Sequence, residues 1–138
     1  MPAESPVGGM SATAERARVF SVEKANQTLP LVRRIVQDVV ATCGELRSLR
    51  DQLADSMDKN AIERDMEGQS RRLEQLQNEL VRIGCELKDP DIGLVDFPGR
   101  YRSRDILLCW KLGEEKVAHW HELHAGATGR HPVSELEE

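Results

Sequence analysis

The sequence predicts an α+β fold: a long antiparallel two-helix hairpin, coiled-coil-like, with a small antiparallel β-sheet and a C-terminal loop packed at its base. The main observation is that apolar residues recur in alternating steps of four and three over two long stretches, the period of a helical seam. A short polar link separates these stretches, and strand-like runs with turn residues follow them. Charged residues make up 31% of the chain and aromatics only 4%, a balance that suits long solvated helices.

The length and the net charge of the chain limit the kinds of protein that it can be. A chain of 138 residues is enough for one domain with a modest core. The net charge of -5, from mixed charges, argues against nucleic acid or an anionic membrane as partner. We find no apolar run long enough to span a membrane and no signal peptide, so we expect a cytoplasmic protein. Cys43, Cys85 and Cys109 are far apart and form no C-x-x-C pair. Reduced, buried thiols are therefore expected.

We divide the chain into a disordered leader over residues 1–17, a single domain over 18–133 and an acidic tail over 134–138. Within the domain we expect the hairpin at about 28–84 and the sheet with its loop at about 85–133. Ser21 is a plausible N-cap for a short turn of helix. Thr28 is a second cap, with Pro30 in the first turn of helix one, where a missing backbone donor costs little. Helix one should then run to about Met57.

The two helical seams are read from their apolar positions. Helix one carries Val32, Val36, Val39, Cys43, Leu46, Leu53 and Met57, with Arg50 interrupting; helix two carries Ile62, Met66, Leu73, Leu76, Leu80 and Ile83, with Gln69 in the polar slot. The link at 58–60 leaves room only for a tight reversal, so the arms are antiparallel and about 40 Å long. The seam is widened at one end by Leu29, Ile35, Val40 and Val81, where the rest of the protein should pack.

The narrow half of the hairpin, from Leu46 to Leu73, is expected to project as a coiled-coil arm. Polar residues in such a seam often set register and partner choice, and here these are Arg50 and Gln69. One function class is therefore a non-catalytic interaction or scaffold module, with the arm pairing in a homodimer or with a helical partner protein.

The second half of the chain predicts three or four antiparallel strands. Gly84 is a natural stop for helix two. After it, "CELK" and "IGLVDF" read as strands around the turn "DPD", and "RDILLCWKL" with "KVAHWHEL" reads as a hairpin around Gly113 and Glu114. The end, "GATGRHPVSELEE", reads as loop and acidic tail.

Three of the four histidines fall just before this loop. His119 and His121 share one face of their strand, an arrangement that suits a metal ion; His124, Asp96 or Glu114 could complete the site. A turn of even length would put Cys109 on the opposite face, away from such a site, and an odd turn would reverse this. The structural alternative is a half-buried or solvated His119 and a hydrogen-bonded His121 at the edge of the core.

"GATGR" contributes Gly126, Gly129 and Arg130. Amides free of side chains beside a guanidinium could hold a carboxylate or phosphate. The common alternative is a loop whose Arg130 pairs with Asp96 or Glu122. The two tryptophans are more typical of core than of a cofactor platform. A nucleophilic Cys109 is disfavoured, because a mid-strand cysteine lacks a basic neighbour and exposure.

These residues lead to a second function class, a polar pocket at the base of the hairpin that binds a small anionic ligand or a divalent metal. The pocket would be built from five ionisable residues: Asp96, Glu114, His121, Glu122 and Arg130. If the protein is an enzyme, His121 is the candidate acid/base, with Glu114 or Arg130 orienting the substrate. Convergence of these residues on an open cleft would favour a site. A closed network of pairs would favour a role in stability.

Several segments together resemble the bacterial domain of unknown function 2203: "FSVEKANQTLP", "IGLVDFP", "LCWKLGE", "WHELHAG" and the final "GR". The resemblance runs from Phe20 to about Val133 and implies no activity. The positions that carry it are Gly93, Asp96, Phe97, Cys109, Trp110, Gly113, Glu114, Trp120, His121, Gly126, Gly129 and Arg130. His124 stands where the relatives have an acidic residue. The resemblance therefore argues against a metal site made of His119, His121 and His124. It favours a site made of His121, Glu122, Asp96, Glu114 and Arg130.

Overall fold

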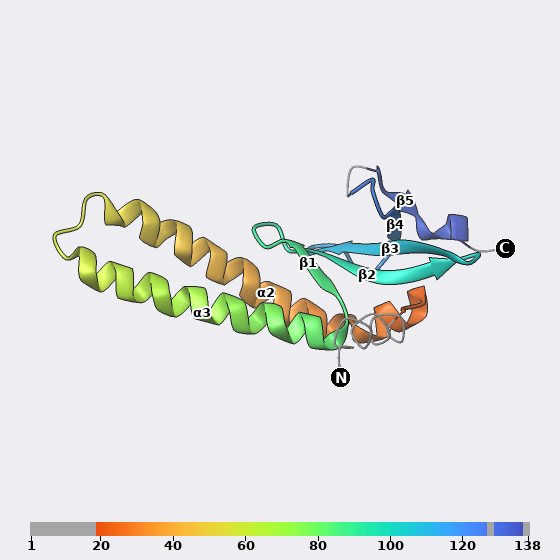
Figure 1. Ribbon diagram of the computed structural model, residues 1–138, viewed down its shortest axis with the longest axis horizontal. Helices are drawn as coiled ribbons and strands as arrows, with labels where there is room; N and C mark the ends of the chain where they lie inside the picture. The colour runs from red at the N-terminus through yellow and green to blue at the C-terminus, as the bar shows by residue number, and fades with distance from the viewer. Residues whose placement is uncertain (1–18, 127–128, 137–138) are drawn as a thin grey trace, which may run out of the picture. The chain divides into compact units, whose positions relative to one another are not determined.

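The structure is a computed structural model that describes residues 19–126 and 129–136. Two helices come first, and a meander of five strands with order β1-β2-β3-β4-β5 follows (Figure 1). The elements are α2 (Val22–Leu53), α3 (Lys59–Ile83), β1 (Glu86–Asp89), β2 (Leu94–Tyr101), β3 (Arg104–Lys111), β4 (His119–Glu122), β5 (His131–Pro132) and the 3-10 helix η2 (Val133–Leu136). The α+β class is confirmed, with one strand more than expected. The expected leader lies outside the described residues.

The chain forms two compact units. One contains the start of α2 up to Leu29, residues 96–110 of β2 and β3, and the chain from Glu114 onward. The other contains residues 30–95 and 111–113, and so the helical hairpin.

The hairpin unit confirms two antiparallel helices that pack together (Figure 1). Its best-buried seam residues are Val32, Val36, Val39, Leu76 and Leu80. Asp58 caps α3 by accepting a 3.1 Å hydrogen bond from the amide of Ala61, and Gly84 ends it in a left-handed conformation with φ 116°. No helix of the described chain is both long and apolar enough to cross a membrane.

The link between the helices differs from the sequence expectation. Helix one ends at Leu53 rather than near Met57, because the turn leading to the Asp58 cap takes up residues 54–58. Met57 is therefore outside the helix and fully exposed, so its expected place in the seam is wrong. Val81 is also exposed and does not widen the seam.

The outer half of the hairpin, from Leu46 to Leu73, is less well buried than the rest. The apolar residues of the predicted seam are half-buried here, whereas Leu49 beside them is buried; the half-buried residues are Leu46, Leu53, Ile62, Met66 and Leu73. Arg50 in the same seam is exposed, and Gln69 is half-buried. Two helices alone do not enclose this part of the seam.

In the other unit, α2 begins earlier than expected. Ser21 is confirmed as an N-cap, since its hydroxyl accepts a 3.1 Å bond from the amide of Lys24. The second start at Thr28 is wrong: its hydroxyl donates to the carbonyl of Ala25 at 2.7 Å, and the helix continues past Pro30.

Tertiary contacts account for this continuation through a proline, which removes a helical hydrogen bond. Asn26 joins the helix to the chain before β4: its Oδ1 accepts from the amide of Val117 at 2.7 Å and its Nδ2 donates to the carbonyl of Val117 at 3.3 Å. Ala25 and Leu29 are buried on the same helix. These contacts exist only if the first two turns are helical.

The connection between β3 and β4 has seven residues, 112–118, an odd number. In the ladder, Cys109 lies opposite His119 and Leu107 lies opposite His121. Cys109 therefore shares the face of the two histidines, which is the alternative that an odd turn predicts. The loop is held outside the ladder by two bonds, from Trp110 Nε1 to the carbonyl of Glu114 at 2.9 Å and from Val117 to Asn26.

The opposite face of the sheet is an apolar core. The ring of Phe20 meets that of Phe97 edge-on at 5.2 Å. A Cβ at Gly99 would lie 3.3 Å from the side chain of Leu108, so glycine allows close packing there. Trp110 and Trp120 are buried, which confirms that both tryptophans belong to the core.

Candidate metal centre

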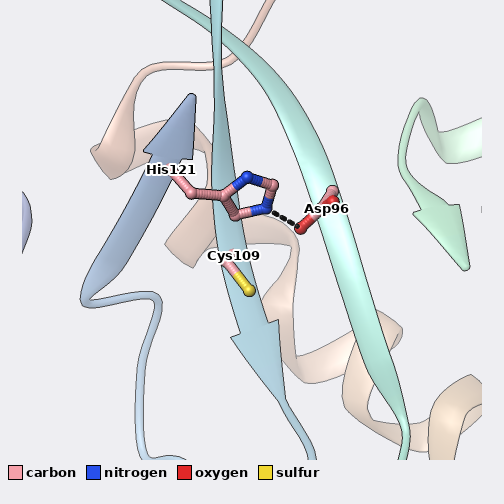
Figure 2. Close-up of side chains that lie close together, drawn as sticks. All are labelled: Asp96, Cys109 and His121. Atoms are coloured by element: carbon pink, nitrogen blue, oxygen red, sulfur yellow. Dashed lines mark hydrogen bonds and ion pairs between the residues drawn. The ribbon is translucent and has the colours of Figure 1, made fainter. Parts of the chain in front are cut away.

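Three polar side chains from three adjacent strands meet on the other face of the sheet (Figure 2). Asp96 comes from β2, Cys109 from β3 and His121 from β4. One carboxylate oxygen, the sulfur and one ring nitrogen all lie within 4.8 Å of one another. The residues are 1%, 0% and 2% exposed, so these polar groups have almost no water to solvate them.

The hydrogen bonds of His121 define its tautomer. Nδ1 lies 2.8 Å from the backbone carbonyl of Glu122, which can only accept, so Nδ1 carries a proton and donates it. Nε2 lies 3.1 Å from Oδ1 of Asp96. In a neutral imidazole the lone pair of Nε2 would then point at a carboxylate oxygen.

Two lone pairs cannot face each other at this distance without a positive charge between them. That charge is either a proton, shared by His121 and Asp96, or a metal ion. A histidine that ligates a metal commonly donates its other N–H to a backbone carbonyl or a carboxylate, as Nδ1 does here.

The third group, Cys109, is a protonated thiol in the metal-free protein. Burial, followed by the nearby charge of Asp96, raises the pKa of the Cys109 thiol to about 12, while Arg130 acts in the opposite direction. The thiol is therefore not a nucleophile near neutral pH. A metal ion that binds the sulfur must displace its proton.

The spacing of the three groups suits a small tetrahedral ion. Bonds of about 2.0 Å to nitrogen and oxygen and about 2.3 Å to sulfur place the ligand atoms of zinc about 3.3 to 3.6 Å apart. Asp96 and His121, at 3.1 Å, are already near this separation. A contraction of at most about 1.5 Å would bring in the widest pair, since all three atoms lie within 4.8 Å of one another.

Beside this trio lies an ion pair between Arg130 and Glu114. The two carboxylate oxygens of Glu114 each lie 2.8 Å from a different terminal nitrogen of Arg130, so the pairing is bidentate. The expected pairing of Arg130 with Asp96 or Glu122 is therefore wrong, because Asp96 is bound to His121 and Glu122 to Arg104. The carboxylate that fills the guanidinium fork comes from the long β3–β4 connection.

Other predicted site residues lie elsewhere. Glu122 points to the Trp120 face and pairs with Arg104 at 3.3 Å. His119 is half-buried, with Nδ1 4.0 Å from Glu114 Oε2, and His124 is exposed. In the part of the chain described, neither joins the trio, so the His119, His121 and His124 triplet is not assembled. Gly126 has φ 69° and Gly129 packs on Ala125, but the two residues between them lie outside the described range.

The five residues of the predicted pocket thus form separate pairs and do not converge, which is the arrangement that favours a role in stability for the predicted pocket. The bonds are His121 with Asp96, Arg130 with Glu114, and Glu122 with Arg104. The residue that sequence reasoning set aside was Cys109. The length of the β3–β4 connection, once known to be odd, would have pointed to it.

Comparison with known proteins gives a family. No curated protein and no solved structure matches the chain. The model of DUF2203, described as an uncharacterised conserved protein, matches residues 18–133 and so includes every residue of the trio and of the Arg130–Glu114 pair. The chain therefore belongs to the DUF2203 family.

Proposed function

We propose that this protein binds a transition-metal ion, with Zn²⁺ the first candidate, through Asp96, Cys109 and His121. The observation that carries the proposal is the buried cluster of three ligand atoms within 4.8 Å of one another, in which Nε2 of His121 lies 3.1 Å from the carboxylate of Asp96 and Nδ1 is already used as a donor. A cation that binds both atoms, together with the adjacent sulfur, removes the conflict.

A role in stability alone gives a weaker account of the trio. Buried ion pairs rarely stabilise more than apolar residues of the same size, because desolvating the charges costs as much as their attraction returns. The charge of a divalent ion is cancelled by one thiolate and one carboxylate, so the complex of the ion with its ligands is neutral. A neutral complex suits a site from which water is excluded. Sulfur and imidazole ligands favour zinc and neighbouring transition metals over Mg²⁺ or Ca²⁺.

Three ligands leave one tetrahedral position for water or another molecule. Structural zinc sites usually have four protein ligands, whereas catalytic sites have three and an open position. The described residues supply three. Under this proposal His121 binds the metal through Nε2 and cannot serve as a proton shuttle, and Glu114, the other acid/base candidate of the sequence, has both carboxylate oxygens held by Arg130.

Metal binding is tested with protein purified without a histidine tag. Isothermal titration with Zn²⁺, and metal analysis after gel filtration, should give one ion per chain. Cys109→Ser and His121→Gln should each lose most of the affinity. Cys43→Ser is the matched control, because Cys43 is also a buried free thiol but belongs to the helical hairpin. Zinc retained equally by all four proteins, or by none, would refute the proposal.

A second candidate function is self-association through the outer half of the hairpin. It is supported by the half-buried seam residues from Leu46 to Leu73, which a second copy would cover. Light scattering at tens of micromolar should then show a dimer, and Leu53→Glu should return it to a monomer. A wild-type monomer across this range would count against the candidate.

A further inference from the structure

The Arg130–Glu114 pair stands on the same sheet face as the metal trio. In the β4–β5 ladder, His119 lies opposite Pro132 and Trp120 opposite His131, and Arg130 comes directly before β5. The ring of His131 packs on Trp120 at 5.0 Å, on the opposite face. Glu114, which Arg130 binds, has its Oε2 4.0 Å from Nδ1 of His119, and His119 shares its face with Cys109 and His121, so the pair lies at that face.

The guanidinium has donors left after pairing with Glu114. Its two terminal nitrogens each give one bond to the carboxylate, whereas a guanidinium has five N–H groups. Nε is buried and finds no partner among the described residues. The carboxylate of Glu114, and to a lesser extent the nearby Cys109, raise the pKa of the Arg130 guanidinium. Glu114 therefore holds the guanidinium near the thiol, with the buried Nε–H left as a donor.

We infer that Arg130, held in place by Glu114, is a positioning residue for the metal ligand Cys109, and that the pair is the outer shell of the metal site. This rests on the metal-binding function proposed above. Arg130 donates to the thiolate that forms when the metal binds and places a positive charge beside it. Glu114 supplies the compensating negative charge and orients the fork.

This arrangement explains why an ion pair stands next to a buried thiol. A thiolate in a dry site needs hydrogen-bond donors as well as the metal, because burial opposes its charge. Outer-shell partners of metal ligands orient the ligand and tune its donor strength, and their removal typically lowers metal affinity about 10- to 100-fold. A hydrogen bond to the sulfur withdraws electron density and makes the thiolate a weaker electron donor to the metal.

The test uses Co²⁺ in place of Zn²⁺ in the full chain, because its sulfur-to-metal charge-transfer band reports the electron density on Cys109. Arg130→Gln should move this band to longer wavelength and weaken binding about 10- to 100-fold. Arg130→Lys keeps the charge without the fork and should fall between wild type and Arg130→Gln. Glu114→Gln should shift the band in the same direction, since it releases the guanidinium.

The matched controls are Arg104→Gln and Glu122→Gln, a surface pair on the other face of the same strands. Both should leave the band in place. The spectrum is taken per bound Co²⁺, so a variant that is only less stable still reports its site. An unchanged band in Arg130→Gln and Glu114→Gln, with one Co²⁺ bound, would overturn the inference and leave the metal site standing. Failure of the wild type to bind metal would instead refute the proposed function, and this inference with it.

Discussion

Cys109 lies directly opposite His119 in the register of β3 and β4, and this single pairing brings its sulfur to the face of His121. A register shifted by one residue would have placed Cys109 against the apolar core and removed the third ligand. The composition of the candidate site thus depends on the number of residues in one loop.

Replacing Arg130 with lysine should destabilise the metal-free protein. Lysine keeps the charge but loses the bidentate contact with Glu114, and both side chains are only about one-fifth exposed, at 19% and 22%. A partly buried carboxylate left underpaired costs roughly 1 to 3 kcal/mol. Thermal unfolding measures the change, with Arg104→Lys as the control that should cost much less. An unaltered melting temperature would mean that the pair does not stabilise the fold, and would support the alternative that Arg130 binds an anionic ligand.

Replacing Asp96 with asparagine should separate metal binding from stability. In the metal-free protein the amide Nδ2 can donate to Nε2 of His121, which supplies the proton that the carboxylate lacks. We expect little loss of stability, or a gain, together with a large loss of zinc affinity. Denaturant unfolding measures the stability of the variant, and a zinc titration measures its affinity for the metal. Equal losses in both would contradict this account of the pair.

The thiol of Cys109 should be inert in the native, metal-free protein. Its pKa is raised to about 12, first by burial and then by the charge of Asp96, so almost no thiolate exists at pH 8. Cys85, whose pKa is also raised to about 12 by burial, should behave alike. Reaction with a disulfide reagent, followed by absorbance, should be slow for both until denaturant is added. Rapid labelling of Cys109 in folded protein would contradict the expectation.

The same two thiols should make the metal-free protein less stable in alkali. Their folded pKa values of about 12 exceed the ordinary thiol value of 9.0, so between these values the folded chain holds protons that the unfolded chain has lost. Their contribution to stability is therefore complete below pH 9 and falls as pH rises, by up to about 1.4 kcal/mol per pH unit for each thiol. Denaturant unfolding of wild type and Cys109→Ala should show a shallower fall in the variant. An equal fall of stability with pH in wild type and variant would contradict this prediction.

The helical hairpin could be predicted because its signals are local. Seam residues such as Val36 and Leu80 repeat at helical spacing, and a glycine ends the second helix, so no distant contact is needed to recognise either arm. The errors fall at the ends, where Asp58 rather than the apolar pattern decides where a helix begins. The start of helix one was missed because Asn26 is bonded to Val117, 91 positions away.

Two of the three residues of the candidate site, Asp96 and His121, were predictable from the sequence, but Cys109 and the pairings were not. Asp96, Glu114, His121 and Arg130 stand out as ionisable groups among glycines and aromatics, and they do lie on or near one face. Which carboxylate meets which cation depends on the seven-residue loop that delivers Glu114. Because Trp110 and Asn26 hold that loop through tertiary contacts, no spacing rule reveals its parity.

The central claim is tested most directly by X-ray absorption at the zinc edge of protein loaded with one equivalent of Zn²⁺. Binding through Asp96, Cys109 and His121 predicts one sulfur at about 2.3 Å and nitrogen or oxygen ligands at about 2.0 to 2.2 Å, with the sulfur absent in Cys109→Ser. A zinc shell without sulfur in the wild type, or a protein that releases its zinc on simple gel filtration, would contradict the account.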